Sequence, residues 1–130
     1  MEVKTVFLDA NVLWSAAGNP AGMPWRLIWE GRADFVTSHY ALAEATRNVP
    51  ATAVGNLNRL MAKIKTVPDA FGPPPAGIML PGKDIPILSS AAACGAQFLV
   101  TGDGKHFDRY YGRVIGGVKI ILPRDLATQL

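Results

Sequence analysis

The chain has 130 residues, a formal net charge of +3, 49% apolar residues and 18% charged residues. These values exclude an intrinsically disordered chain, and the length predicts a single domain over residues 1–130 with a sizeable core. The one cysteine excludes a disulfide framework and a zinc site built from paired cysteines.

The first residues contain no secretion signal, because Met1–Thr5 does not combine a basic stretch with a following apolar one. No apolar run approaches the roughly 18 residues that a membrane helix requires. We therefore expect a cytoplasmic protein without a membrane segment. The positive charge is compatible with a polyanionic partner but does not identify one.

Four short runs are rich in β-branched and aromatic residues and are predicted to be strands: 3–8, 35–37, 98–100 and 118–122. Helical patterns separate them. This alternation predicts an α/β fold in which helices cover both faces of a parallel sheet, with right-handed crossovers.

The first helices are predicted at 11–17 and from Pro24 through Trp29, with Gly31 closing the second. Ser38 is a good N-cap for a further helix that runs to about Asn48.

In the second half of the chain, apolar residues at spacings of three and four predict a helix over 51–65. The proline-rich segment 68–82 is predicted to be a loop. Asp84 stands at the N-cap position of an alanine-rich helix, with Pro86 in its first turn.

Four acidic residues occupy notable positions in this pattern. Asp9 and Asp103 follow predicted strands, Glu44 lies inside a helix, and Asp84 begins another. Ligands of open parallel sheets bind at the carboxyl ends of the strands, and hard cations such as Mg²⁺ prefer carboxylate oxygens. The sequence therefore predicts a divalent-metal site able to activate a water molecule against a phosphodiester.

The same motifs, in this order, resemble a PIN domain: residues 6–13 around Asp9, the helical Glu44 preceded by Ser38, residues 83–88, and residues 98–103. The chain is most similar to small single-domain prokaryotic members, many of which are VapC-type toxins of toxin-antitoxin pairs. The resemblance covers nearly the whole chain.

The resemblance implies a three-layer α/β/α fold with a central parallel sheet, Mg²⁺- or Mn²⁺-dependent ribonuclease activity, an antitoxin partner and a homodimer. It assigns the catalytic and metal-binding roles to Asp9, Glu44, Asp84 and Asp103. The supporting residues that it implies around them are Asn11, Ser38 and Thr101.

One position departs from the family pattern. Many relatives have an additional acidic residue just before the position of Asp84, whereas here residues 80–83 contain none, which leaves the number of metals open. Asp108 could compensate, but we expect it at the surface.

Basic residues are the expected contacts for the RNA backbone. The helix predicted at 51–65 carries cations on its polar face, and others flank the predicted acidic site. The predicted RNA-binding residues are Arg59, Lys63, Lys65, Lys83 and Lys105.

Each acidic residue also has an ordinary structural explanation. Asp84 could be only a helix cap, Glu44 a solvated helix residue, Asp9 a strand end that caps the next helix, and residues 101–104 a turn. Their joint order favours the metal site.

Histidines and tryptophans are expected in supporting roles. His39 and His106 belong to no recognisable catalytic triad, so we expect surface or supporting positions, although His106 could shape the mouth of the site. The tryptophans, which we expect in the core or at a dimer contact, are Trp14, Trp25 and Trp29.

Two other functions remain as alternatives. The first is a PIN-like module that has lost catalysis and only binds RNA or protein; the retained acids argue against it, since clustered negative charge does not help to bind RNA. The second is a haloacid-dehalogenase-type phosphatase, because the motif at Asp9 resembles that of those enzymes. They use a second aspartate where this chain has Asn11.

Overall fold

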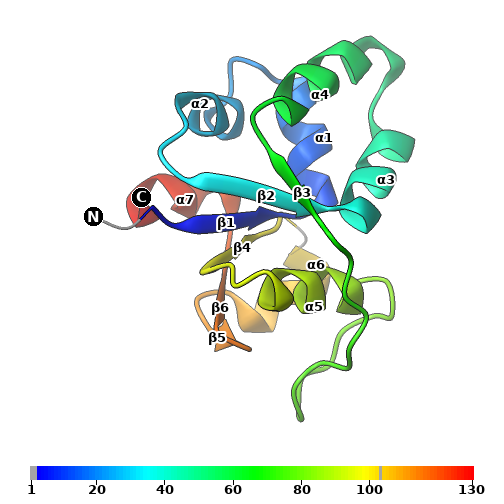
Figure 1. Cartoon of the computed structure of the whole chain (residues 1–130), viewed down its shortest axis with the longest axis vertical. Helices are drawn as coiled ribbons and strands as arrows, with labels where there is room; N and C mark the ends of the chain where they lie inside the picture. The colour runs from blue at the N-terminus through cyan, green and yellow to red at the C-terminus, as the bar shows by residue number, and fades with distance from the viewer. Residues whose placement is uncertain (1–2, 103) are drawn as a thin grey trace.

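A computed structural model describes residues 3–102 and 104–130. Within these residues the chain forms a six-stranded sheet with the strand order β3-β2-β1-β4-β6-β5. The strands are β1 (Thr5–Leu8), β2 (Asp34–Ser38), β3 (Lys65–Val67), β4 (Phe98–Val100), β5 (Val114–Ile115) and β6 (Val118–Ile121). All neighbouring pairs are parallel except β5 and β6 (Figure 1).

Helices cover both faces of this sheet and give the three-layer α/β/α architecture (Figure 1). One face is covered by α1 (Ala10–Gly18), α2 (Met23–Glu30), α3 (His39–Asn48) and α4 (Val54–Met61), and the other by α5 (Ile85–Ala93) and α6 (Gly104–Phe107). The remaining helical elements are the short 3₁₀ turns η1 (Ala51–Ala53), η2 (Asp108–Tyr110) and η3 (Pro123–Asp125) and the C-terminal α7 (Leu126–Gln129). The expected α/β class is confirmed.

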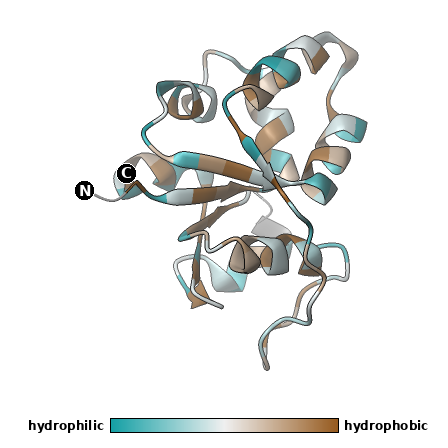
Figure 2. Ribbon diagram, in the orientation of Figure 1, coloured by the Kyte–Doolittle hydropathy of each residue, from teal (hydrophilic) through white to brown (hydrophobic). Residues whose placement is uncertain are grey.

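The two central strands carry the most hydrophobic part of the core (Figure 2). Val6, Phe7 and Leu8 of β1 and Leu99 and Val100 of β4 are completely buried. Strands buried on both faces consist of continuous apolar runs rather than alternating ones, which is why these segments could be recognised in the sequence.

The boundaries of most predicted elements are confirmed to within about two residues, the usual uncertainty of helix and strand ends. The structure adds an edge hairpin that was not predicted. Gly116 and Gly117 connect β5 to β6 with positive φ values of 59° and 82°, the backbone of a two-residue hairpin turn that glycine adopts without strain.

The helix predicted over residues 51–65 is wrong at both ends. Its first residues form η1, α4 ends at Met61, and Lys65 already begins β3, paired with Val36 of β2. The helical spacing of the apolar residues continues to Ile64, which hid the change of structure. The β-branched Thr66 and Val67 favour the extended strand that follows.

Residues 68–82 form the predicted loop, which projects from the end of the molecule below α5 (Figure 1). Among the described helices, none is both long and apolar enough to cross a membrane.

Candidate metal centre

Asp9 lies where β1 ends at the carboxyl edge of the sheet. It is the N-cap of α1, and its Oδ1 accepts a hydrogen bond of 2.7 Å from the backbone N–H of Ala10. Its own backbone N–H donates to the carbonyl of Val100 at 3.0 Å, which fixes it beside β4. The residue is only 3% exposed. A strand end and a helix start therefore hold this carboxylate in one orientation.

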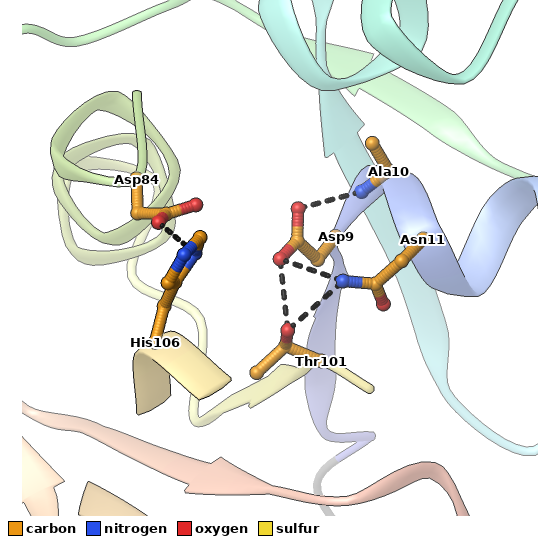
Figure 3. Close-up of polar contacts among 6 residues, drawn as sticks. All are labelled: Asp9, Ala10, Asn11, Asp84, Thr101 and His106. Atoms are coloured by element: carbon orange, nitrogen blue, oxygen red, sulfur yellow. Dashed lines mark hydrogen bonds and ion pairs between the residues drawn. The ribbon is translucent and has the colours of Figure 1, made fainter. Parts of the chain in front are cut away.

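Two side chains brace the other oxygen of Asp9 (Figure 3). Thr101 Oγ1, at the end of β4, donates to Asp9 Oδ2 at 2.9 Å. Asn11 Nδ2 lies 3.4 Å from the same oxygen and 3.3 Å from Thr101 Oγ1, and Asn11 Oδ1 accepts from the N–H of Gly102 at 2.8 Å. The structure thus brings Asn11 and Thr101 against Asp9, as the PIN resemblance implies.

The charged form of the Asp9 carboxyl is unfavourable in its surroundings. Its pKa is raised from 3.8 to about 6, chiefly because burial disfavours the charged form, and the charges of Asp84 and Glu44 raise it further. The hydrogen bonds from Thr101 and Ala10 oppose this shift but do not cancel it. Asp84 and Glu44 therefore lie within electrostatic range of Asp9 at this edge, in an arrangement that a bound cation would relieve.

Asp84 occupies the N-cap position of α5, as predicted, but its side chain does not cap the helix. Its backbone is in the right-handed helical region (φ −95°, ψ −14°) rather than in the extended conformation usual for a cap, and Pro86 in the first turn has no N–H to offer. The carboxylate is buried, with Oδ2 located 2.8 Å from Nδ1 of His106 (Figure 3). The simple capping explanation of Asp84 is therefore wrong.

The third acid, Glu44, is half-buried on α3. Its neighbour Tyr40 was not recognised from the sequence. The pKa of Tyr40 is raised by burial and by the charges of Glu44 and Asp84, whereas Arg47 and Lys83 lower it. Tyr40 therefore shares the electrostatic environment of the acids, and two cations reach the same region.

Ser38 has a local structural function. Its hydroxyl accepts a hydrogen bond of 3.1 Å from the N–H of Ala41, which makes it the side-chain N-cap of α3. The N–H of Tyr40 is bound separately by Asp69 Oδ1 at 2.8 Å. Together these bonds fix the start of the helix that carries Glu44.

Two predicted site residues, Asp103 and the side chain of Lys105, lie outside the described part of the structure. Among the residues that are described, no three His, Cys, Asp or Glu side chains are grouped closely enough to hold a metal ion. A metal at this edge would therefore need a ligand beyond Asp9, Glu44 and Asp84, and Asp103 follows directly on Thr101 and Gly102.

The predicted RNA-binding residues do not form one surface. Lys83 directly precedes Asp84 and acts on Tyr40 at the carboxyl edge. In contrast, Lys63 and Lys65 flank the beginning of β3, and in a parallel sheet this is the opposite edge. They line a hollow there together with Asp34, which begins β2.

Arg59 is also remote from the acids, because it joins an aromatic cluster with α2. Its guanidinium carbon lies 5.5 Å from the ring centroid of Trp25 and 5.6 Å from that of Trp29, and the two indoles are stacked. Lys63 Nζ lies 4.9 Å from the Trp29 ring. Of the predicted core residues, Trp25 is buried and Trp14 half-buried, but Trp29 is 40% exposed.

Two tyrosines in the segment after α6, Tyr110 and Tyr111, hold neighbouring segments in place through hydrogen bonds. Sequence reasoning missed both. Tyr111 Oη donates to the carbonyl of Thr101 at 2.9 Å. Tyr110 Oη exchanges hydrogen bonds with the backbone N–H and carbonyl of Met79, which ties the proline-rich loop to the domain. Apart from the adjacent aromatic pair itself, the sequence gives no signal for these bonds. Asp108 is exposed, as expected.

A hollow of about 250 Å³ adjoins the braced carboxylate. It is lined by Asn11 and Gly102 from the site, by Trp14 on the next turn of α1, and by Pro24 and Pro123. Its walls are partly apolar and partly polar, so it offers space beside Asn11 for part of a bound molecule.

Comparisons with known proteins agree with this architecture. The chain is similar to a chain in the VapBC2 complex of Rickettsia felis, solved with a DNA fragment from its promoter; the TM-score is 0.64 at 17% identity over 91% of this chain and 98% of that one. The chain described here therefore has a PIN-like fold. PAE2754 from Pyrobaculum aerophilum is also similar, with a TM-score of 0.62 at 19% identity over 98% of this chain and 88% of that one.

No protein-family model matches the chain, and no curated protein matches its sequence. At identities below a fifth, the structural similarity shows the PIN-like fold alone. What this PIN-like chain does must therefore be argued from its own residues.

Proposed function

We propose that this PIN-like protein is a metal-dependent endoribonuclease and the toxin component of a toxin-antitoxin pair. The observation that carries the enzymatic part is the buried carboxylate of Asp9, placed at the carboxyl edge of the sheet within electrostatic range of Asp84 and Glu44. Groups whose pKa is shifted by burial and by like charges are typical of functional sites. A purely structural role would not require three acids at one edge.

These residues fit a hard divalent cation. They offer carboxylate oxygens, which Mg²⁺ and Mn²⁺ prefer, and the raised pKa of Asp9 reflects a charge that a cation would offset. Asp9, Glu44 and Asp84 would hold the ion together with Asp103. A bound divalent ion lowers the pKa of a water ligand and offsets charge on a phosphate.

The chain's own residues provide the remaining requirements. Thr101 and Asn11 fix the orientation of the Asp9 carboxylate. Lys83 supplies positive charge beside the acids for the RNA backbone. The hollow beside Asn11 leaves space for a nucleotide next to the site. All three contributions come from residues at or beside the carboxyl edge.

The direct test is cleavage of RNA by the purified protein with Mn²⁺ or Mg²⁺ and with EDTA. We expect metal-dependent cleavage of RNA and no turnover of a phosphomonoester. RNA binding without cleavage would indicate the inactive module instead, and phosphomonoester turnover without RNA cleavage would indicate the phosphatase. Against the latter, the Asn11 amide is engaged with Asp9, Thr101 and Gly102 rather than available for proton transfer.

The biological part of the proposal is supported by the resemblance of the motifs and by the VapBC2 neighbour. We expect an antitoxin that blocks the acidic site with an arginine, because a guanidinium binds carboxylates through two bonds and replaces the charge of the metal. The test is growth on expression of the chain alone and RNA cleavage by the complex with a co-expressed antitoxin. An actively cleaving complex would contradict the inhibitory role.

A homodimer is part of the same proposal. The exposed Trp29 and the rest of the α2 and α4 surface are candidates for its contact or for that of the antitoxin. Light scattering of the purified protein measures the oligomeric state directly, and a monomer at high concentration would remove the dimer from the proposal.

A further inference from the structure

We propose that His106 is a positioning residue of the metal centre, which holds Asp84 so that its second oxygen faces Asp9. The inference rests on the proposed function, because it assigns a role around the metal site described above. It goes beyond that function by adding a nitrogen side chain to a site that the sequence pattern describes with acids and their oxygen-bearing neighbours alone.

The first step is the unusual state of Asp84. An aspartate at an N-cap usually binds the N–H groups of the first helical turn and so stabilises the helix. Asp84 makes no such bond, although it stands at the N-cap position of α5. Its carboxylate is buried and turned toward α6, with Oδ2 at 2.8 Å from His106 Nδ1. The side chain is therefore held by a contact outside its own helix.

The second step is the rigidity of the histidine. His106 lies on the short helix α6, and the adjacent Phe107 is completely buried and anchors that helix in the core. The imidazole itself is mostly covered, with 23% of its side-chain surface exposed. The 2.8 Å between Nδ1 and Oδ2 brings the imidazole into direct contact with that carboxylate oxygen. The histidine therefore limits the positions that this oxygen of Asp84 can take.

The third step is the direction of the carboxylate. Figure 3 shows that His106 contacts one oxygen of Asp84 from the side of α6, while the other oxygen is directed toward Asp9. Carboxylates that bind metals are commonly oriented by a hydrogen bond to their second oxygen. His106 thus holds one oxygen of Asp84 by a close contact, as Thr101 and Asn11 hold one oxygen of Asp9 by hydrogen bonds.

The test is Mn²⁺ binding, measured by titration calorimetry on the metal-free protein. We expect His106→Leu, which keeps the volume but removes the polar contact, to weaken Mn²⁺ binding about tenfold or more. His106→Asn places an amide N–H near the position of Nδ1 and should restore most of the affinity. His39→Leu is the matched control, because His39 is exposed at the start of α3, and its affinity should equal that of the original protein.

The outcomes separate the two proposals. If the original protein binds no Mn²⁺, the metal site itself fails. If it binds Mn²⁺ and His106→Leu binds equally well, only the role of His106 fails. Equal loss in His106→Leu and His106→Asn would overturn positioning in favour of direct ligation by the imidazole. Thermal melts in EDTA confirm that each variant is folded, and should His106→Leu not fold, the same comparison is made with His106→Ala.

Discussion

The carboxyl ends of the parallel strands form one edge of the sheet and their amino ends form the other. These two edges differ in charge and in burial. At the carboxyl edge, Asp9 and Asp84 are buried, and each is held by polar side chains from other elements. At the amino edge, Lys63 and Lys65 are exposed around a shallow hollow, and Lys63 packs on the exposed Trp29. The two acids are fixed by contacts within the protein, whereas Lys63 only lies over the ring of Trp29.

This difference decides how strongly each edge indicates a function: the buried carboxylates are strong evidence, and the exposed cations are weak evidence. Buried, braced charges are expensive to keep, so they indicate a site. Exposed cations on aromatic rings contribute about 0.5–1 kcal/mol each to stability and need no ligand to explain them. The amino edge can thus be basic for reasons of packing, and its RNA-binding role stays a prediction.

The largest contrast between the edges is expected in catalysis. Asp9→Asn should reduce metal-dependent RNA cleavage by more than about a hundredfold, since altering groups that merely support metal ligands already costs 10–100-fold. Asp34→Asn is the matched control, because Asp34 is exposed at the amino edge. It should leave the rate unchanged. Similar rates for all three proteins would remove Asp9 from the site.

The same substitution should have the opposite effect on stability. The pKa of Asp9 is raised to about 6 in the folded protein, so the fold favours the protonated form and loses stability as pH rises from about 4 to above 6. At neutral pH the penalty is at most about 3 kcal/mol. The Asn variant avoids this penalty but loses some of the hydrogen bonds that Thr101 and Asn11 make to Asp9, which offsets part of the gain.

Asp9→Asn should therefore be more stable than the original protein at pH 7.5 in EDTA, and this advantage should vanish near pH 4. Denaturant unfolding at the two pH values measures the difference. A variant that is less stable at pH 7.5 would mean that the hydrogen bonds outweigh the burial of charge. Asp34→Asn again serves as the control, because Asp34 is exposed at the amino edge.

A smaller effect is expected from the aromatic cluster at the amino edge. Trp29→Ala removes one ring of a stacked pair and the surface on which Arg59 and Lys63 pack. We expect a loss of about 1–2 kcal/mol in the free energy of unfolding, with RNA cleavage unchanged. Reduced cleavage in a fully folded variant would show that this edge takes part in function.

The smallest expected effect compares one cation from each edge. Lys83→Ala should weaken RNA binding and lower the slope of log affinity against log salt by about 1, since one phosphate contact is lost. Lys63→Ala should change the slope less, because Lys63 is remote from the acids. Fluorescence anisotropy with a short RNA at several salt concentrations measures both, and equal slopes for the two variants would extend the RNA surface to the amino edge.

The sequence predicted the core of the fold because the central strands are apolar throughout, and their helices carry clear caps and turn residues. It missed β3 because Ile64 continued the helical spacing of α4 into a short strand. The hairpin of β5 and β6 had a signal in Gly116 and Gly117, but the two-residue β5 is too short to show alternation.

For the candidate site, the sequence could place the acids in order along the chain but not orient their side chains. Whether Asp84 caps its helix depends on a backbone angle and on His106, which arrives from another element. The same limit applies to Lys63. Helical spacing predicts that Lys63 lies on the polar face of a helix. Only the pairing of β3 with β2 shows that it lies near the amino ends of the strands.

The hydrogen bond between Asp9 and Thr101 joins residues 92 positions apart, and β1 pairs with β4 across the same interval. During synthesis, Asp9 therefore leaves the ribosome 92 residues before Thr101. Until β4 has emerged, β1 can pair only with β2, and the Asp9 carboxylate lacks its hydrogen bond from Thr101. A nascent chain of this protein is thus expected to lack an ordered acidic site until residues 98–101 have emerged.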